Sequence, residues 1–229
     1  MRGGDIARVV LLAGPSGSGK SYVARHTGLP VLPLDDFYLN GDDPRLPLVG
    51  DAVDVAATKD GHRAARYLAP EPTMVDWESP ASWDATAAVA AIELLARTGT
   101  VEVPHYDISV DRCTGYERLT LGPAPLFVAE GIFAAEIVAT CRERGVLAEA
   151  YALRRPRSVT FARRLFRDLA EHRKPPGTLL RRGIRLYRGE ARILGRQVAL
   201  GCRAASATTI RRAIARRMAD AGAAPTAPS

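Results

Sequence analysis

The segment Gly14–Ser21, GPSGSGKS, restricts the fold of this chain more than any other part of the sequence. Before it, the apolar run at residues 8–13, RVVLLA, predicts a strand buried on both faces. After it, we expect a helix from Lys20 to His26. Glycines allow the backbone between these elements to wrap around an anion, so that its N–H groups and the helix N-terminus point inward. A strand, a glycine-rich loop and a helix in this order favour an α/β fold with a parallel sheet.

The loop also fits the pattern G-x-x-x-x-G-K-[ST], which indicates an ATP or GTP site. Lys20 would reach the β- and γ-phosphates, and the Ser21 hydroxyl would ligate Mg²⁺. The alternative is a chance loop of glycine and serine. Neither the DxxG switch nor the NKxD motif of a GTPase occurs in the sequence. The expected nucleotide-binding residues are Gly14, Pro15, Ser16, Gly17, Ser18, Gly19, Lys20 and Ser21.

Length and cysteine content suggest the class of protein. The 229 residues suffice for one α/β domain with a sizeable core. No apolar run reaches the roughly 18 residues of a membrane-spanning helix, and no export signal is apparent, so we expect no membrane partner. The three cysteines, Cys113, Cys141 and Cys202, are widely spaced and form no CxxC motif, which favours a reduced, cytoplasmic protein without structural zinc.

Charge is distributed unevenly along the chain. Residues 151–229 contain 19 of the 32 Lys and Arg residues but only 4 of the 25 acidic residues. A segment this basic favours polyanionic partners such as nucleotide phosphates or nucleic acid; the alternative is a solvated basic face. Nucleic acid is the less favoured partner, because the basic helices lack interleaved aromatic residues and a known binding motif.

Apolar periodicity and turn residues predict the remaining elements. Residues 1–220 are expected to form a single three-layer domain, and residues 221–229 a disordered tail. Residues 39–81 are rich in Pro, Gly and Asp and predict a long functional loop. The expected strands are 31–35, 125–131 and 148–154, the expected helices are 84–97, 156–172, 178–198 and 206–219, and a β-hairpin is expected to have arms at 100–107 and 117–122 around Thr114-Gly115.

Two acidic residues lie where predicted strands end. Ligands of doubly wound sheets bind beyond the carboxyl ends of the strands, so Asp35 would lie near the γ-phosphate. A carboxylate there can accept the proton of an attacking hydroxyl and help to hold the metal ion. Glu130, at the end of another strand, could anchor Mg²⁺ through water; its alternative is a structural pair with an arginine.

Taken in order, the motifs GPSGSGKS, DDFY, DWESPASWD, VPHYD, FVAEGI and ARRLFRDLAEHRK resemble the uridine/cytidine kinase family. Phosphoribulokinase and pantothenate kinase belong to neighbouring families. The resemblance covers roughly residues 8–175. It implies a P-loop NTPase three-layer α/β fold with a five-stranded parallel core sheet, a small β-hairpin substrate lobe at about residues 100–122 and a basic helical lid at about residues 154–176.

The resemblance also implies roles for individual residues. Asp35 matches the family's general base, and Glu130 its second acidic magnesium residue, so the implied metal ligands are Ser21, Asp35 and Glu130. The substrate-binding positions are Tyr38, Asp76 and Tyr106, and Arg164 and Arg167 match the catalytic arginines of the lid. Alternatives are core packing for the two tyrosines and a capping role for Asp76. Asp36 and Trp83 are expected to be structural.

Two segments depart from the family pattern. Asp111 stands where the family has a substrate-binding histidine, and Cys113 where it has an arginine. Residues 171–174, EHRK, replace the E-R-G-R of the lid. We therefore expect phosphoryl transfer from ATP, with Mg²⁺, to a hydroxyl of a nucleoside-like small molecule. The alternatives are a kinase for another small alcohol, such as a sugar phosphate or a pantothenate-like compound, and an ATP-binding regulatory module with a basic, nucleic-acid-binding C-terminal third.

Overall fold

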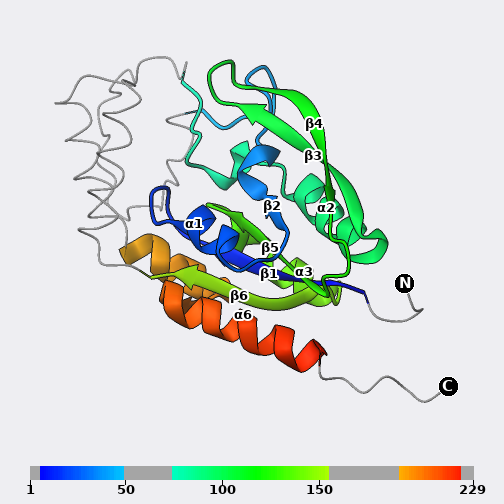
Figure 1. Ribbon diagram of the computed structural model, residues 1–229. Coiled ribbons are helices and arrows are strands. Elements are labelled where there is room, and N and C mark those ends of the chain that lie inside the picture. Colours follow the sequence, from blue (N-terminus) through cyan, green and yellow to red (C-terminus); the bar gives the residue numbers. More distant parts are fainter. Residues whose placement is uncertain (1–5, 49–73, 155–190, 223–229) are drawn as a thin grey trace.

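A five-stranded parallel sheet forms the centre of the molecule (Figure 1). The computed structural model describes residues 6–48, 74–154 and 191–222. In the order β2-β5-β1-β6-β7, the strands are Val31–Pro33, Leu126–Gly131, Arg8–Ala13, Leu147–Leu153 and Arg203–Ala205. Because every neighbouring pair is parallel, the carboxyl ends of β2, β5 and β1 meet at one edge of the sheet.

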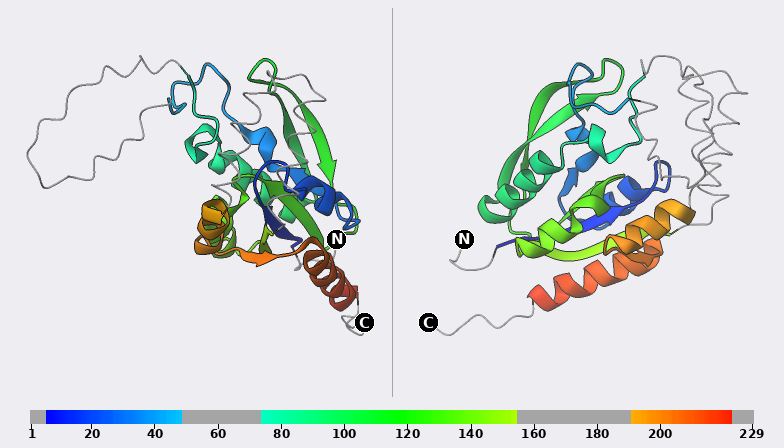
Figure 2. Two further views of the ribbon diagram at one scale, coloured as in Figure 1. Left: turned by 90° about the vertical axis from the view of Figure 1, so that its left-hand side faces the viewer. Right: turned by 180° about the vertical axis from the view of Figure 1, so that it is seen from behind.

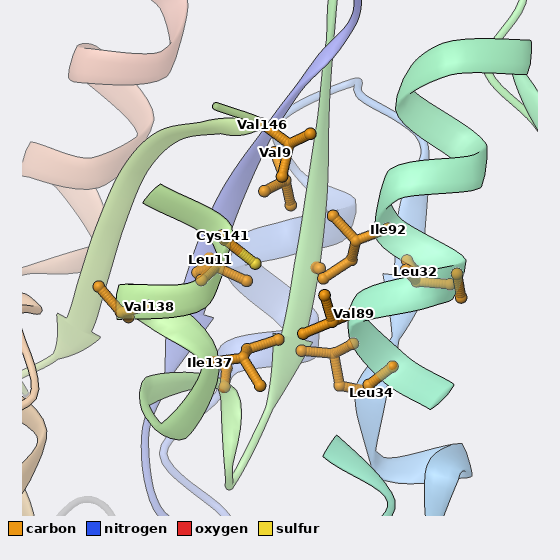
Figure 3. Close-up of a cluster of buried hydrophobic side chains, with 14 of the residues drawn as sticks. Val9, Leu11, Leu32, Leu34, Val89, Ile92, Ile137, Val138, Cys141 and Val146 are labelled. Carbon is orange, nitrogen blue, oxygen red and sulfur yellow. The ribbon is translucent and has the colours of Figure 1, made fainter. Parts of the chain in front are cut away.

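Helices cover both faces of this sheet (Figure 2). Alternate side chains of β1 point in opposite directions: Val9 and Leu11 join one buried cluster, whereas Val10 and Leu12 join another. The first cluster packs α2 (Ala85–Thr98) and α3 (Val138–Glu143) against the sheet, as Figure 3 shows. The second packs α1 (Lys20–Arg25) and α6 (Ala207–Gly222) against the other face. The predicted three-layer α/β architecture is confirmed.

The second strand is shorter than predicted. It ends at Pro33, and Leu34–Phe37 form a 3₁₀ turn, η1, instead of a continued strand. The Asp35 carboxylate accepts a hydrogen bond from the Ile132 N–H, at 2.7 Å, which draws this residue toward the neighbouring strand end. Asp35 therefore lies one turn beyond β2, still at the same edge of the sheet.

The β-hairpin is confirmed, but its predicted turn at Thr114-Gly115 is wrong. Its arms are β3 (Thr100–Asp107) and β4 (Arg112–Thr120), and Gly115 lies inside β4 opposite His105. Asp107 fixes the turn at residues 108–111, because its carboxylate accepts bonds from the Ser109 N–H and hydroxyl at 2.8 and 2.7 Å. Asp111 closes the turn with a left-handed φ of 49°.

Helix α2 begins and ends close to the predicted residues. The Asp84 carboxylate accepts from the Ala87 N–H at 2.8 Å, and Gly99 ends the helix with a φ of 77°. Two short elements were missed by the sequence analysis: α3, and β7 at the edge of the sheet. Residues 191–199 are helical, and α6 continues to Gly222, two residues past the predicted domain end. None of the helices within the described ranges has the length and apolarity that crossing a bilayer requires.

Candidate active site

The glycine-rich loop connects β1 to α1 in the predicted context. Gly17 and Gly19 have φ angles of 78° and 89°, values that strain residues with a Cβ. A Cβ at Gly14 would lie 2.9 Å from the Ser18 hydroxyl oxygen. Within this loop, Ser18 and Lys20 are buried, and the Lys20 side chain is only 6% exposed. The loop is therefore a tight backbone cradle with an ammonium group at its centre.

Two carboxylates approach this ammonium group, one from the turn η1 after β2 and one from the end of β5. Lys20 Nζ lies 3.8 Å from Asp35 Oδ2, while the other Asp35 oxygen is fixed by Ile132. Glu130 lies on β5 opposite Leu12 of β1, so its side chain reaches the start of α1, where it hydrogen-bonds with Ser21. The structure brings together Lys20, Ser21, Asp35 and Glu130 at one edge of the sheet.

The environment of Glu130 favours its neutral form. Burial raises the pKa of its carboxyl group, an effect that the Lys20 charge and the Ser21 hydrogen bond partly offset. No described residue hydrogen-bonds to Glu130 Oε2, although this atom is buried. The charges of Lys20 and Arg25 and the hydrogen bond with Ser21 all favour the ionised form of Glu130. The alternative role, a structural pair with an arginine, is thus represented only by the weaker charge interaction with Arg25, and the described residues form no direct ion pair between Glu130 and an arginine.

These features fit a nucleotide and a magnesium ion. The buried Ser18 hydroxyl oxygen, like Glu130 Oε2, has no hydrogen-bond partner in the described structure, so a bound ligand can satisfy both. Ser21, Asp35 and Glu130 offer oxygen ligands. The described residues contain no cluster of three or more His, Cys, Asp or Glu side chains suited to a metal. Mg²⁺ does not require one, because it keeps several waters and takes ligands from substrate phosphates.

Next to Asp35, three aromatic rings form a wall. The ring centroid of Tyr38 lies 5.8 Å from that of Trp77 and 5.6 Å from that of Tyr106. The ring centroids of Trp77 and Tyr106 are 6.4 Å apart. We call Tyr38, Trp77 and Tyr106 the aromatic wall. It joins three segments, since η1 leads into Tyr38, Trp77 lies in the DWESP loop and Tyr106 is on β3. Both tyrosines were predicted from the sequence, whereas Trp77, which follows Asp76 directly, was not.

The hydroxyls of the two tyrosines bind backbone carbonyls. Tyr38 donates to the Trp77 carbonyl and Tyr106 to the Leu39 carbonyl, each at 3.2 Å. Burial raises the pKa of Tyr106 to about 12 and that of Tyr38 further, so both hydroxyls stay neutral donors. The structure thus shows for both rings the packing role given above as the alternative, and their predicted contact with a substrate stays a prediction.

Asp36 points away from Lys20 and toward the hairpin. Its Oδ1 accepts from the Tyr106 N–H at 3.4 Å, and burial raises the pKa of its carboxyl group. This contact ties the hairpin to η1, so Asp36 has a structural role. The basic lid, which is the partner expected for Asp36 from the sequence, lies outside the described residues. Trp83 is structural too, because it is buried and donates its indole N–H to the Leu34 carbonyl at 2.6 Å.

The remaining predicted substrate residues lie around the aromatic wall. Asp76 Oδ1 accepts from the Glu78 N–H at 3.1 Å, which is the capping role given above as its alternative. Asp111 closes the hairpin turn, and its carbonyl accepts from the Gly41 N–H at 2.7 Å. Cys113 donates its N–H to Asn40 Oδ1 at 2.8 Å. Arg164 and Arg167, predicted on a lid, lie outside the described residues.

Comparison with known proteins supports the fold. No protein-family model and no curated protein sequence matches the chain. The structure of a candidate fructose transport system kinase from Silicibacter sp. TM1040 matches with a TM-score of 0.54 at 18% identity, over 85% of this chain and 87% of that one. The chain has the P-loop kinase fold. At this identity the likeness shows the fold alone and says nothing of the acceptor.

Two further structures match more weakly. A candidate uridine kinase from Bacillus stearothermophilus gives a TM-score of 0.39 at 18% identity, over 72% of this chain and 80% of that one. The structure of the protein YGR205w gives a TM-score of 0.48 at 16% identity, over 90% of this chain and 88% of that one. At these TM-scores the two add nothing to the fold assignment.

Proposed function

We propose that the protein transfers the γ-phosphoryl group of ATP to a hydroxyl group of a nucleoside-like small molecule, as uridine/cytidine kinases do. The observation that carries the proposal is the meeting of Lys20, Asp35 and Glu130 at the ends of adjacent parallel strands. A phosphate-binding loop alone would also fit a hydrolase. A carboxylate fixed 3.8 Å from the loop lysine adds the base that transfer to a hydroxyl requires.

Each group has a chemical task in this proposal. Lys20 neutralises charge on the β- and γ-phosphates, and the loop N–H groups bind their oxygens. Asp35 Oδ2 accepts the proton of the acceptor hydroxyl, while the Ile132 N–H holds Oδ1 and so fixes the orientation of the carboxylate. Ser21, Asp35 and Glu130 would hold Mg²⁺, which when bound neutralises phosphate charge. Catalysis here is positioning and charge stabilisation rather than covalent chemistry.

The aromatic wall supports an acceptor with a flat face. The three ring centroids of the aromatic wall lie within 6.4 Å of one another, and Tyr38 follows Asp35 by three residues. Such rings can pack on a nucleobase or on the apolar face of a sugar. A nucleoside provides a planar base together with a primary hydroxyl. Asp76, Tyr106 and Asp111 are the proposed polar contacts.

A panel of acceptors tests the proposal. Uridine, cytidine, adenosine, fructose and pantothenate would each be incubated with ATP and Mg²⁺, and ADP and the phosphorylated acceptor would be measured. Fructose is included because the structural neighbour is described as a candidate fructose transport system kinase. We expect phosphorylated product from a nucleoside and almost none from the Lys20→Ala variant. ATP binding without product from any acceptor would contradict the proposal and favour a regulatory ATP-binding module.

A further inference from the structure

Away from the candidate active site, a pocket lies between α1 and α6, on the sheet face opposite α2. Its volume is about 360 Å³, within the range of about 300–1,000 Å³ typical of small-molecule sites. It is separate from the phosphate-binding loop, because its described lining starts at the C-terminal end of α1. The lining residues are His26, Thr27, Thr208, Arg211, Arg212 and Ala215. We call this the α1–α6 pocket, after the two helices labelled in Figure 1.

Positive charge dominates this lining. Arg211 and Arg212 lie in the first turns of α6, are exposed, and form no ion pair with any residue that the structure describes. Two other arginines near this face do have partners: Arg217 binds Glu149 at 2.7 Å, and Arg203 donates to the Tyr151 hydroxyl at 2.6 Å. Of the described residues that line the pocket, none is acidic. Two guanidinium groups without counter-charges thus face one concave surface.

The α1 side of the pocket adds further groups. His26 Nδ1 donates to the Tyr22 carbonyl at 2.7 Å, which leaves Nε2 as a second donor once the ring is protonated. The Tyr22 and His26 rings stack with centroids 3.9 Å apart, and Tyr22 is 49% exposed. On the other side, Thr208 lies in the first turn of α6, whose N-terminus carries partial positive charge.

From this arrangement we infer that the α1–α6 pocket binds a phosphate group of a small phosphorylated molecule. Arginine pairs suit phosphate because each guanidinium can donate two parallel hydrogen bonds to its oxygens. The hydroxyl of Thr208 and a protonated His26 would supply further donors. A pocket of this volume suits a mononucleotide, whose base can pack on the exposed Tyr22–His26 ring pair. This site is independent of the proposed phosphoryl transfer, since none of its lining residues takes part in that reaction.

Nuclear magnetic resonance on the full chain tests this inference locally. The chain has four histidines, so the His26 ring signal can be assigned with a His26→Gln variant. Inorganic phosphate and uridine 5′-monophosphate would be titrated separately into the Lys20→Ala variant, in which binding at the phosphate-binding loop is weakened. We expect both ligands to shift the His26 signal saturably, and a tighter response to the nucleotide would show that its base is also bound.

Two double variants with the same change of charge decide the origin of the signal. Arg211→Ala/Arg212→Ala should weaken phosphate binding at least about tenfold, because charge-assisted contacts are lost. Arg192→Ala/Arg216→Ala removes two exposed arginines outside the pocket lining and should leave the affinity nearly unchanged. Both changes replace exposed arginines in helices by alanine, a good helix former, so folding should be retained.

Three results would overturn the inference. The first is a His26 signal that does not respond saturably to either ligand. The second is equal weakening in both double variants, which would indicate general charge attraction. The third is a response to an RNA oligonucleotide but not to the two small ligands, which would make this face a nucleic-acid surface instead.

Discussion

The Ile132 N–H donates a hydrogen bond to Asp35 Oδ1, at 2.7 Å, and so joins the end of β5 to the turn after β2. One oxygen of the carboxylate is thereby fixed, and the other faces Lys20 at 3.8 Å. The neighbouring Asp36 faces the hairpin instead. Two adjacent carboxylates in the sequence therefore have different surroundings, and they should differ in function.

Replacing each of these carboxylates separately tests the difference. Asp35→Asn should keep ATP binding but lower kcat by about 10² to 10⁴, the usual contribution of a positioned general base. Asp36→Asn should leave kcat within about tenfold of the wild type, because its contact is with the Tyr106 backbone. Steady-state kinetics and ATP titration measure both effects. The assignment is wrong if Asp36→Asn is the more damaging change.

Gly131 makes the approach of Asp35 possible. A Cβ at this position would lie 2.8 Å from Leu34 Cβ and 2.9 Å from Asp35 Oδ1, closer than real contacts allow. Gly131→Ala should therefore displace the carboxylate and lower kcat. At Gly115 an added Cβ would meet nothing within 4 Å, so Gly115→Ala is the matched control. Equal activity of the two variants would show that the position of Asp35 does not limit turnover.

Glu130 gives the protein a predicted dependence of stability on pH. Burial raises the pKa of Glu130 in the folded state above the usual 4.5. At pH values between 4.5 and this raised pKa, the folded state therefore binds more protons than the unfolded state. The free energy of unfolding therefore falls as the pH rises from 4.5 through the folded pKa. Gln resembles the protonated side chain, so Glu130→Gln should raise the thermal midpoint at neutral pH.

Thermal unfolding of the ligand-free protein at about pH 7.5 and about pH 4 measures this effect. The difference in thermal midpoint between Glu130→Gln and the wild type should be smaller at the lower pH, where both side chains are neutral. Activity should fall in the same variant, since an ionised carboxylate is lost from the proposed metal site. A lower thermal midpoint for Glu130→Gln at neutral pH would contradict the predicted sign.

Asp111, which stands where the uridine/cytidine kinase family has a histidine, predicts a substrate preference if the acceptor is a pyrimidine nucleoside. An ionised aspartate can only accept hydrogen bonds, so it suits the amino group of cytosine better than the carbonyl of uracil. A mismatched pairing costs about 1–3 kcal/mol, or roughly tenfold to a hundredfold in kcat/KM. The kcat/KM for cytidine should therefore exceed that for uridine, and Asp111→His should reduce the ratio of the two values. Histidine tolerates the left-handed φ of 49° at this position.

The sequence also allows a structural role for Asp111, in which its side chain pairs with Arg112 or Arg118 of the hairpin. Arg112 binds Asp42 at 2.8 Å, and Arg118 binds Glu102 at 2.9 Å. The prediction that Asp111 pairs with one of these arginines is therefore not seen among the described residues. Equal kcat/KM values for cytidine and uridine, unaltered by Asp111→His, would leave Asp111 with its turn-closing role alone.

Packing of α2 offers a test of the fold that is independent of any activity. Ile92 is fully buried against the sheet (Figure 3), whereas Leu94, on the same helix, is 49% exposed. Ile92→Ala should lower the free energy of unfolding by about 2–5 kcal/mol, and Leu94→Ala by much less. Urea unfolding of the two variants measures the difference. Similar losses would mean that α2 does not pack as described.

Long apolar runs made much of the fold predictable. Residues 9–13 and 126–131 are buried, and their nearly continuous apolar sequence predicts strands covered on both faces. The strand β7 has only three residues, RAA, so no periodicity could indicate it. The hairpin turn was misplaced because Thr114-Gly115 resembles a turn, whereas the actual turn depends on side-chain bonds made by Asp107.

The candidate site was predictable where residues are close in sequence or follow strands. The glycine-rich loop carries its geometry locally, and Asp35 and Glu130 follow from the rule that strand ends meet. Trp77 could not be found in this way, since its neighbours Tyr38 and Tyr106 are distant in sequence and only the folded chain brings the rings together. The role of Ile132 was hidden because its backbone, rather than its side chain, makes the contact.

The hairpin leaves the core and returns to it at a single point. Thr100, the first residue of β3, is paired with Thr120, the last residue of β4, and the Leu121 N–H donates to the Gly99 carbonyl at 2.9 Å. The parallel sheet is thus continuous without the hairpin. An insertion of this kind can be lengthened, shortened or exchanged by recombination while the parallel sheet stays intact. Under the proposed function, in which the hairpin contacts the acceptor, new acceptor preferences can thus arise without a new fold.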